Sequence, residues 1–294
     1  MIAPAIHRHR RIPTRSALAA ERLPVARSLL ARCSLCFHRC ATDRLSGPSG
    51  LCHAGDQARV FAAQTDVSDE MELLPSFAIS LSGCNLRCDF CITGAPSWNP
   101  RAGNPLAPHG LREQAERAVA RGAKHIMILG GEPTIHLPAL LELIAALPDT
   151  APIVLKTNAC FTEDVRTLLA GLVNVWLPDF KFGNPDCAHR LAGIPPSTDY
   201  RTTVTNNLLW MAAQEASSDL IVRHLIMPGH VDCCWQPVAQ WLAIHLPDVK
   251  VSLRSGYWPA WHSTRHRELR IPLPQSDLNR ALAIARDHDL TLVT

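Results

Sequence analysis

Short apolar runs of high β-propensity recur along the chain and alternate with segments of helical periodicity. The apolar runs occupy residues 77–82, 126–129, 153–157, 173–177, 220–227 and 249–253. The segments with apolar residues at helical spacing occupy residues 111–121, 137–147, 165–170, 200–214, 235–245 and 278–288. Strands that alternate six times with helices are typical of a parallel α/β fold, which is either a barrel or a doubly wound sheet.

Polar residues and glycines gather where these predicted strands end. The residues that follow the successive runs include Cys84, Gly130, Gly131, Glu132, Asn158, Asp179 and Lys181. In both parallel architectures the chemistry takes place at the carboxyl ends of the strands. Glycine at such places could be an ordinary turn residue, but a cysteine, a glutamate and an Asp/Lys pair on one rim indicate a functional site.

The first 75 residues lack this alternation. Residues 1–30 are predicted to be a flexible basic arm or a short helix, with the helix over residues 15–30. The first 20 residues contain four arginines and no acidic residue, which could also mark an organelle transit peptide. Residues 31–75 are predicted to form a small Cys-rich metal-binding extension, and residues 76–294 the core barrel with C-terminal βα elements.

The composition is that of an ordinary globular chain. It has 294 residues, of which 47% are hydrophobic and 19% charged, so it can build a core without disulfide bonds. The formal net charge of +3 is too small by itself to indicate binding to nucleic acid. The longest apolar stretch, residues 137–147, contains a proline and a glutamate and is shorter than a membrane span. No secretory signal is recognised, and we expect a cytoplasmic protein without a membrane partner.

Cysteine is the unusual component of the sequence. There are 11 cysteines, and most of them fall in two groups between residues 33 and 91. The first group, with the spacing C-x2-C-x3-C-x11-C, consists of Cys33, Cys36, Cys40 and Cys52. The second group, with the spacing C-x3-C-x2-C, consists of Cys84, Cys88 and Cys91. Clustered thiols in a chain of this size without an export signal indicate metal ligands rather than disulfides.

The first group supplies four thiols, which is enough for a closed tetrahedral site. Zn²⁺ and an auxiliary iron–sulfur cluster both suit such a group, and His38 is a further possible ligand. A metal at this place would hold together a segment that has little core of its own.

The second group supplies three thiols, one fewer than a closed site needs. Structural zinc takes four ligands, and no histidine lies within this loop. Three thiolates therefore suggest an iron–sulfur cluster with one iron open to a substrate or cofactor, and a set of buried cysteines without a metal is the alternative. The remaining thiols have no ligand spacing and are predicted to be inert: Cys160, Cys187, Cys233 and Cys234.

Two motifs carry a resemblance to a known family. Residues 82–91, SGCNLRCDFC, resemble the cluster motif of the radical S-adenosylmethionine (SAM) superfamily, and residues 130–133, GGEP, match that family's motif one strand later. The segments 177–181 and 223–229, together with the first cysteine group, resemble the branch of proteins similar to pyruvate formate-lyase activating enzymes. The resemblance covers about residues 31–258 and implies a partial (β/α)6 TIM-like barrel.

The resemblance also implies roles for individual residues. The ligands of a [4Fe-4S] cluster would be Cys84, Cys88 and Cys91, and SAM would bind the open iron. Glu132, with the backbone of Gly130 and Gly131, would receive the methionyl ammonium group, since only a backbone without a side chain permits such a close approach. Phe90 and Ile92 would lie near the adenine. Other parts of SAM or the substrate would be held by Asn158, Asp179, Lys181 and Arg223.

The implied activity is reductive cleavage of SAM to methionine and a 5′-deoxyadenosyl radical that abstracts hydrogen from a small molecule or peptide. The electron would come from a donor such as flavodoxin or ferredoxin. A glycyl-radical-enzyme activase acting on a protein partner is one alternative, and a non-enzymatic two-metal-site protein that binds nucleic acid is another. After Cys91 the chain reads ITGAPSW where relatives in the branch often have Gln-Asn, and residues 252–262 also depart from the branch. Both departures predict a substrate that differs from that of better-known relatives.

Overall fold

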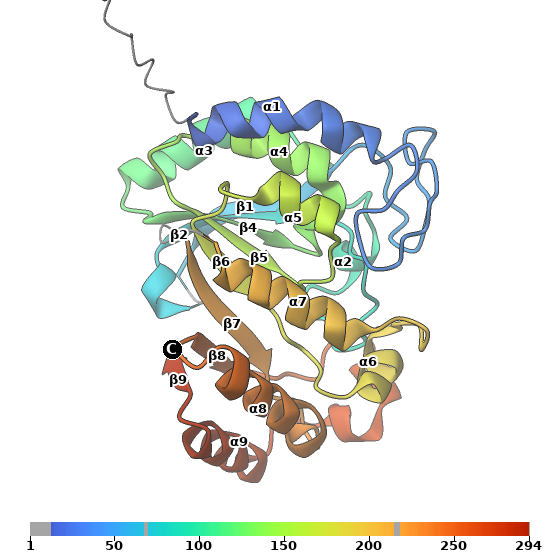
Figure 1. Ribbon diagram of the computed structural model, residues 1–294, viewed down its shortest axis with the longest axis vertical. Coiled ribbons are helices and arrows are strands. Elements are labelled where there is room, and N and C mark those ends of the chain that lie inside the picture. The colour runs from blue at the N-terminus through green and yellow to red at the C-terminus, as the bar shows by residue number, and fades with distance from the viewer. Residues whose placement is uncertain (1–12, 68–69, 215–217, 294) are drawn as a thin grey trace, which may run out of the picture.

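The computed structural model describes residues 13–67, 70–214 and 218–293. Within these residues the strands are β1 (Arg59–Asp66), β2 (Ser76–Leu81), β3 (Asn104–Pro105), β4 (His125–Gly130), β5 (Ile153–Thr157), β6 (Val175–Pro178), β7 (Asp219–Leu225), β8 (Lys250–Arg254) and β9 (Thr291–Val293). They form one sheet with the order β3-β1-β2-β4-β5-β6-β7-β8-β9 (Figure 1). From β2 to β9 every neighbouring pair in this order is parallel. The six predicted strands correspond to β2, β4, β5, β6, β7 and β8, which confirms the parallel α/β fold.

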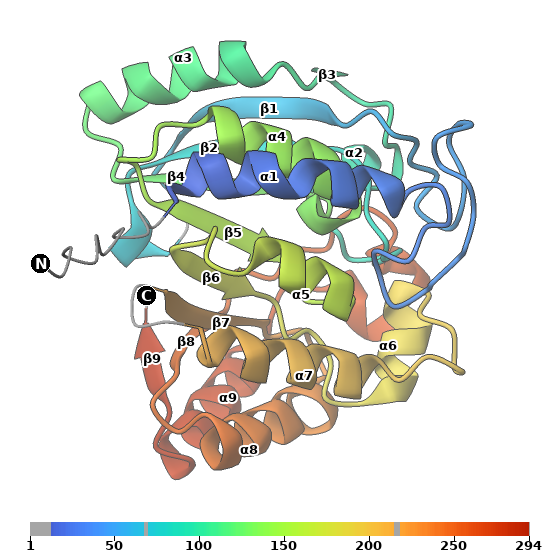
Figure 2. The same cartoon turned by 45° about the horizontal axis from the view of Figure 1, so that its top comes forward.

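Helices cover the outer face of this curved sheet (Figure 2). They are α1 (Arg15–Ser28), α3 (Pro108–Ala120), α4 (Leu137–Ala146), α5 (Glu163–Leu169), α6 (Pro185–Ala192), α7 (Tyr200–Ala212), α8 (Gln236–His245) and α9 (Gln275–Asp287). The one-turn helix α2 (Ala95–Trp98) belongs to the loop after β2. Because a doubly wound sheet carries helices on both faces, this is the barrel alternative. The sheet ends at β3 and β9, so the barrel is incomplete. In the described parts of the chain, every helix is too short or too polar to span a bilayer.

Alternate side chains of the parallel strands face two separate cores. The outer core, between the sheet and the helices, includes Ile126, Ile128, Leu140, Leu155 and Trp176. The inner core fills the barrel and includes Leu73, Met127, Val154, Leu177 and Ile221. Lys156, Asp179 and Arg223 each follow an inner-core residue by two positions, so the period of a strand places them on the inner face. The inside of the barrel therefore changes from apolar to charged towards the carboxyl ends of the strands.

The N-terminal helix is packed on the barrel and is not a free arm in its described part. Ala19 and Ala26 of α1 are fully buried, and α1 lies along α4 (Figure 2). Arg15 donates hydrogen bonds to the carbonyl oxygens of Pro148 at 2.5 Å and Ala151 at 2.7 Å. The short helix predicted over residues 15–30 is thus present as residues 15–28. The preceding residues 1–12, with three of the four arginines, lie outside the described residues.

The Cys-rich extension is shorter than the predicted range of residues 31–75. β1 lies within that range and pairs antiparallel with β2, so it belongs to the sheet of the barrel. The sequence did not reveal this strand because its eight residues do not alternate in burial, and only Val60 is buried. The structure therefore places the end of the extension before Arg59.

A buried histidine makes the stability of the fold dependent on pH. His224 lies in β7 with its ring enclosed, and its Nδ1 is 2.7 Å from the carbonyl oxygen of Phe180. Burial lowers the pKa of His224 from 6.5 to about 4. Between these values the unfolded chain takes up a proton that the folded chain excludes. The free energy of unfolding should therefore fall by about 2 kcal/mol from pH 7 to pH 5 through this residue, and the loss should level off below pH 4.

The measurement is urea unfolding at pH 7 and pH 5. His224→Asn keeps a donor near the Phe180 carbonyl and should reduce the pH dependence by that amount, whatever its effect on stability at pH 7. His109→Asn, at an exposed position of α3, is the matched control and should retain the full dependence. An unchanged slope in His224→Asn would contradict the assignment.

Candidate functional site

A cavity of about 360 Å³ opens at the carboxyl ends of the parallel strands. The lining residues from the predicted set are Cys84, Cys88, Phe90, Cys91, Ile92, Gly130, Gly131, Asn158, Asp179, Lys181 and Arg223. Residues that come from five strand ends and one long loop thus meet around one space. Of the residues predicted for the second cysteine group and its cofactor, Glu132 is the one that does not line this cavity.

The second cysteine group lies in the loop that follows β2. Cys84 and Cys88 are buried and Cys91 is partly exposed. The Cys84 sulfur accepts a hydrogen bond from the backbone N–H of Leu86 at 3.3 Å and one from Asn158 Nδ2 at 3.7 Å. Burial raises the pKa of the Cys88 thiol to about 12, and the positive charge of Lys181 opposes that rise. Burial also raises the pKa of Cys84, so Cys84 and Cys88 are protonated thiols unless a metal ion binds them.

The two glycines at the end of β4 are required by contact with the protein itself. A Cβ atom on Gly130 would lie 2.2 Å from the carbonyl oxygen of Leu81, and one on Gly131 would lie 1.9 Å from that of Gly83. The backbone N–H of Gly131 donates to Leu81, and that of Glu132 to Gly83, both at 2.8 Å. The prediction attributed these glycines to close approach of a ligand. The structure shows that they also dock the GGEP segment onto the backbone immediately before Cys84, and their contact with a ligand stays a prediction.

Glu132 makes its hydrogen bonds within the protein, and its predicted contact with SAM stays a prediction. Its carboxylate is fully buried and accepts hydrogen bonds from the backbone N–H and the hydroxyl of Thr134, the hydroxyl of Thr157 and the backbone N–H of Asn158. Burial raises its pKa, and the hydrogen bond from Asn158 opposes that rise. Four protein donors surround the carboxylate, so in this arrangement it joins the ends of β4 and β5.

Charged side chains form a network on the opposite wall. Lys181 Nζ lies 2.7 Å from Asp179 Oδ2, and Arg223 lies 3.1 Å from Asp179 Oδ1. Although burial raises the pKa of Asp179, the charges of Lys181 and Arg223 lower it to about 2. The network is completed by Glu70, which is fully buried and accepts from Arg223 Nε at 2.5 Å. The pKa of Asp179 is thus lowered and that of Lys181 is raised by their mutual attraction, so this pair is ionised near neutral pH.

Glu70 was not predicted for this site, and Arg254 was expected only as part of the segment 252–262 at the last strand end. Glu70 precedes a 3-10 turn in a segment without periodicity, and its carboxylate also accepts from Ser252 at 2.8 Å. No sequence signal links it to β7 and β8. Arg254 lines the cavity at the end of β8, and the position of that strand end was a usable signal.

Three apolar residues of the cavity lining differ in their exposure to solvent. Phe90 is buried and packs edge-on against Phe182, with the ring centroids 6.0 Å apart. Ile92 and Trp258 are 77% and 63% exposed although both line the cavity. An apolar molecule or group that enters the cavity would cover them.

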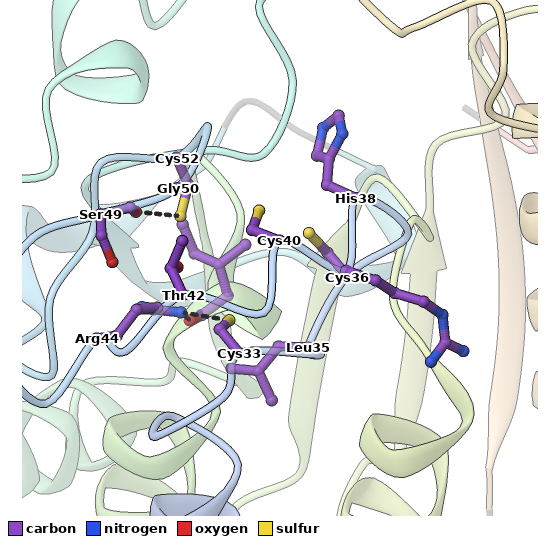
Figure 3. Close-up of a pocket in the computed structure, with 12 residues that line it drawn as sticks. Cys33, Leu35, Cys36, His38, Cys40, Thr42, Arg44, Ser49, Gly50 and Cys52 are labelled. Carbon is purple, nitrogen blue, oxygen red and sulfur yellow. Dashed lines mark hydrogen bonds between the residues drawn. The ribbon is translucent and has the colours of Figure 1, made fainter.

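The first cysteine group surrounds a separate, smaller pocket (Figure 3). The pocket is lined by all four predicted cysteines, Cys33, Cys36, Cys40 and Cys52. The His38 ring points away from them in Figure 3, and its Nε2 lies 2.8 Å from the carbonyl oxygen of Asn85. His38 is thus occupied elsewhere, and the group consists of four thiols. Burial raises the pKa of Cys36 to about 12.

The sulfur spacing of both groups is wider than that around a single metal ion. Among the residues that the structure describes, neither group brings three ligand atoms within 4.8 Å of one another. Thiolates that all bind the same metal ion must lie close to one another. The thiolates of an iron–sulfur cluster bind different iron atoms, so they lie farther apart.

Comparison with known proteins gives the family. Residues 79–242 match the sequence model of the Radical SAM superfamily, which is more than half of the chain. The chain belongs to the radical SAM superfamily. It is a radical SAM enzyme whose cofactors are a [4Fe-4S] cluster and SAM, and an enzyme of this kind needs a reductant and a substrate.

Curated relatives cover the chain to different extents. The chain is 28% identical over 277 residues to an uncharacterized protein of Methanocaldococcus jannaschii, covering 92% of this chain and 79% of the relative. A 7-carboxy-7-deazaguanine synthase of Hyperthermus butylicus is 34% identical over 92 residues, 31% of this chain and 37% of that enzyme. A GTP 3′,8-cyclase of Pseudomonas savastanoi is 35% identical over 77 residues, 26% of this chain and 23% of that enzyme. The chain thus spans well under half the length of these two named enzymes.

Solved structures show the same fold. A radical SAM methyltransferase from Sphaerobacter thermophilus superposes with a TM-score of 0.54 and 13% identity, covering 95% of this chain and 92% of that one. Streptococcus suis SuiB bound to the precursor peptide SuiA superposes with a TM-score of 0.53 and 16% identity, covering 71% of this chain and 46% of SuiB. The predicted barrel of the radical SAM type is confirmed. The narrower resemblance to pyruvate formate-lyase activating enzymes stays a prediction, since these named relatives are other kinds of radical SAM enzyme.

Proposed function

We propose that this enzyme cleaves SAM reductively to methionine and a 5′-deoxyadenosyl radical, which abstracts hydrogen from a small molecule or a peptide. The observation that carries the proposal is the single cavity at the strand ends. Three cysteines of one loop, two docked glycines and a charged wall face each other across it. In this proposal the cofactor and the substrate meet in this one cavity.

The cluster ligands in this proposal are Cys84, Cys88 and Cys91. All three line the cavity, and a free thiol at Cys88 would be protonated at neutral pH. The backbone N–H of Leu86 and the amide of Asn158 are already directed at the Cys84 sulfur, so they would stabilise a thiolate there. Bound together, the cluster and SAM supply the radical chemistry, while the chain positions them and excludes competing reactions.

SAM would contact the residues between the cluster loop and the charged wall. In this proposal the backbone of Gly130 and Gly131 lies beside the methionyl group, and Phe90 and Ile92 lie beside the adenine. Polar contacts would come from Asn158, Asp179, Lys181 and Arg223. Glu132 acts as a positioning residue, because its carboxylate fixes the backbone of Asn158 at 2.7 Å.

The charge of the cavity favours a substrate or cofactor group that is anionic. The ionisable lining residues other than cysteine and tyrosine are Lys156, Asp179, Lys181, Arg223 and Arg254. Four of these five residues are cationic, and Glu70, which is bound to Arg223, adds a second carboxylate beside Asp179, so cationic side chains outnumber carboxylates. The carboxylate of SAM uses part of this charge in the proposal, and Arg254 at the end of β8 is available to a carboxylate or phosphate of the substrate.

The test is anaerobic reconstitution of the full chain with iron and sulfide, followed by reduction with dithionite in the presence of SAM. The proposal expects a brown protein that releases 5′-deoxyadenosine. A colourless protein after reconstitution, or a brown one that releases none, would overturn it. If a candidate partner enzyme acquires a glycyl radical, detected by electron paramagnetic resonance, the activase alternative replaces the small-molecule or peptide substrate.

For the first cysteine group we propose an auxiliary iron–sulfur cluster rather than zinc. The wide spacing of its sulfurs supports this assignment. Arg44 is buried beside the group, and its NH1 lies 3.7 Å from the Cys33 sulfur. The same guanidinium donates to the carbonyl oxygens of Ala54, Gly55 and Ile135. A buried cation fixed in this way would compensate the negative charge of a cluster with four thiolates.

The Cys36→Ala variant should separate the two cysteine groups. We expect the reconstituted wild-type chain to hold about eight irons, and the variant about four, because one of two four-iron clusters is lost. The measurement is iron per chain, with the Cys160→Ser variant as the matched control that keeps all seven ligands. Loss of zinc with unchanged iron in Cys36→Ala would show that the group binds zinc instead.

A further inference from the structure

Three of the four cysteines predicted to be inert converge on one histidine, away from the cavity. Cys187, His230, Cys233 and Cys234, here called the Cys3His group, have their ligand atoms within 4.8 Å of one another. None of these residues lines either the cavity or the pocket of the first cysteine group. The prediction of scattered thiols without ligand geometry is therefore wrong for three of them. Cys187 is far from the other three residues in the sequence, and the fold brings the four together.

The distances within the group match the edges of a tetrahedron around one metal ion. Cys233 Sγ lies 3.7 Å from the sulfur of Cys187 and 3.9 Å from that of Cys234. His230 Nδ1 lies 3.5, 3.3 and 3.8 Å from the sulfurs of Cys187, Cys233 and Cys234. A tetrahedral zinc site with ordinary bond lengths has sulfur–sulfur edges of about 3.8 Å and sulfur–nitrogen edges of about 3.6 Å. A four-iron cluster would need its thiolates farther apart, since they bind different irons.

A wide helical turn brings the last two cysteines into the group. Residues Val231–Trp235 form a π-helical turn between β7 and α8, in which the backbone N–H of Trp235 donates to the carbonyl oxygen of His230 at 3.3 Å. Such turns are rare and are frequent at functional sites. Cys187 approaches from α6, 43 residues earlier than His230. Two distant segments thus supply the four ligand atoms.

The far side of the histidine ring has a partner suited to a metal ligand. His230 Nε2 lies 3.4 Å from the carboxylate of Glu268, which also accepts from Arg190 at 2.6 Å. When Nδ1 binds a metal, Nε2 carries the proton and donates to such a carboxylate. Arg190 NH2 also lies 3.4 Å from Nε2, and its ion pair with Glu268 holds the acceptor in place.

We propose that the Cys3His group binds one Zn²⁺ ion as a structural site. Three sulfurs and one imidazole nitrogen form one of the usual ligand sets of structural zinc. Cys187, His230 and Cys234 are buried, and four protein ligands leave no open position for a substrate. On binding, the thiol protons pass to solvent and zinc joins α6 to the turn before α8. This inference is independent of the proposed SAM cleavage.

The test is zinc per chain in the full-length protein, measured by mass spectrometry of the metal. The Cys187→Ser variant should contain one zinc fewer per chain than the wild type, with unchanged iron. Cys160→Ser, which replaces the one cysteine outside all three groups, is the matched control and should keep the wild-type zinc. Because only the difference is used, zinc at the first cysteine group would not affect the result.

The wild-type chain provides a second measurement that does not depend on a variant folding. A zinc chelator should release this zinc and make Cys187, Cys233 and Cys234 react together with an alkylating reagent, as identified by peptide mass spectrometry. Equal zinc in Cys187→Ser and wild type, loss of iron in place of zinc, or a disulfide between Cys187 and Cys233 would each overturn the proposal. Alkylation of the three thiols without release of zinc would also overturn it.

Discussion

The Cys88→Ala variant is expected to lose the [4Fe-4S] cluster of the cavity and to release no 5′-deoxyadenosine above the level of a reaction without reductant. Cys88 is one of only three thiols in its loop, and its sulfur is buried beside Lys181. Alanine at this position leaves two thiolate ligands, and two are too few to hold a cluster that needs three. The chain itself should remain folded, because alanine at this position removes a single sulfur atom.

The measurement combines visible absorbance, iron per chain and 5′-deoxyadenosine after reduction. If the first cysteine group holds its own cluster, some absorbance and about half of the iron remain, while SAM cleavage is still lost. Cys160→Ser should resemble the wild type in all three. SAM cleavage retained by Cys88→Ala would contradict the assignment of the cavity, whatever the iron content.

The Gly131→Ala variant is expected to destabilise the chain by about 3 kcal/mol and to disturb the cluster loop. A Cβ atom at this position would lie 1.9 Å from the carbonyl oxygen of Gly83. That backbone cannot move without shifting Cys84, which follows it directly. The free energy of unfolding in urea and the iron content after reconstitution should therefore both decrease.

Gly110→Ala is the matched control for this substitution. Gly110 lies in α3, and a Cβ atom there would meet nothing within 4 Å. Alanine is the better helix former, so this variant should be as stable as the wild type or more stable by up to about 1 kcal/mol. If Gly131→Ala were as harmless as Gly110→Ala, the close contact between the two motifs would not exist.

The strand ends could be predicted from the sequence because their signal is local. Each of the six runs combines an apolar stretch with a polar or glycine-rich end, and a parallel fold brings such ends together. β1 could not be predicted in this way, since only Val60 in it is buried. Its place in the sheet depends on pairing with β2, which is a tertiary contact.

The residues of the cavity could be predicted, but not what several of them contact. Glu132 belongs to a recognisable motif, yet its four donors come from residues up to 26 positions later. Glu70 meets Arg223 across 153 residues. The Cys3His group is the extreme case, because Cys187 and His230 have no common local pattern. The sequence His-x-x-Cys-Cys at residues 230–234 was the only available signal, and it lacked the fourth ligand.

The first cysteine group depends on parts of the chain that are synthesised much later than the group itself. Its segment is fixed by the hydroxyl of Thr162, which donates to the carbonyl of Ser34 across 128 residues, and by the Phe37 backbone N–H, which donates to the carbonyl of Cys160. These partners leave the ribosome long after Cys33 and Cys36 do. We therefore expect the four thiols to stay accessible to oxidants and to other metals until β5 and the start of α5 have been synthesised.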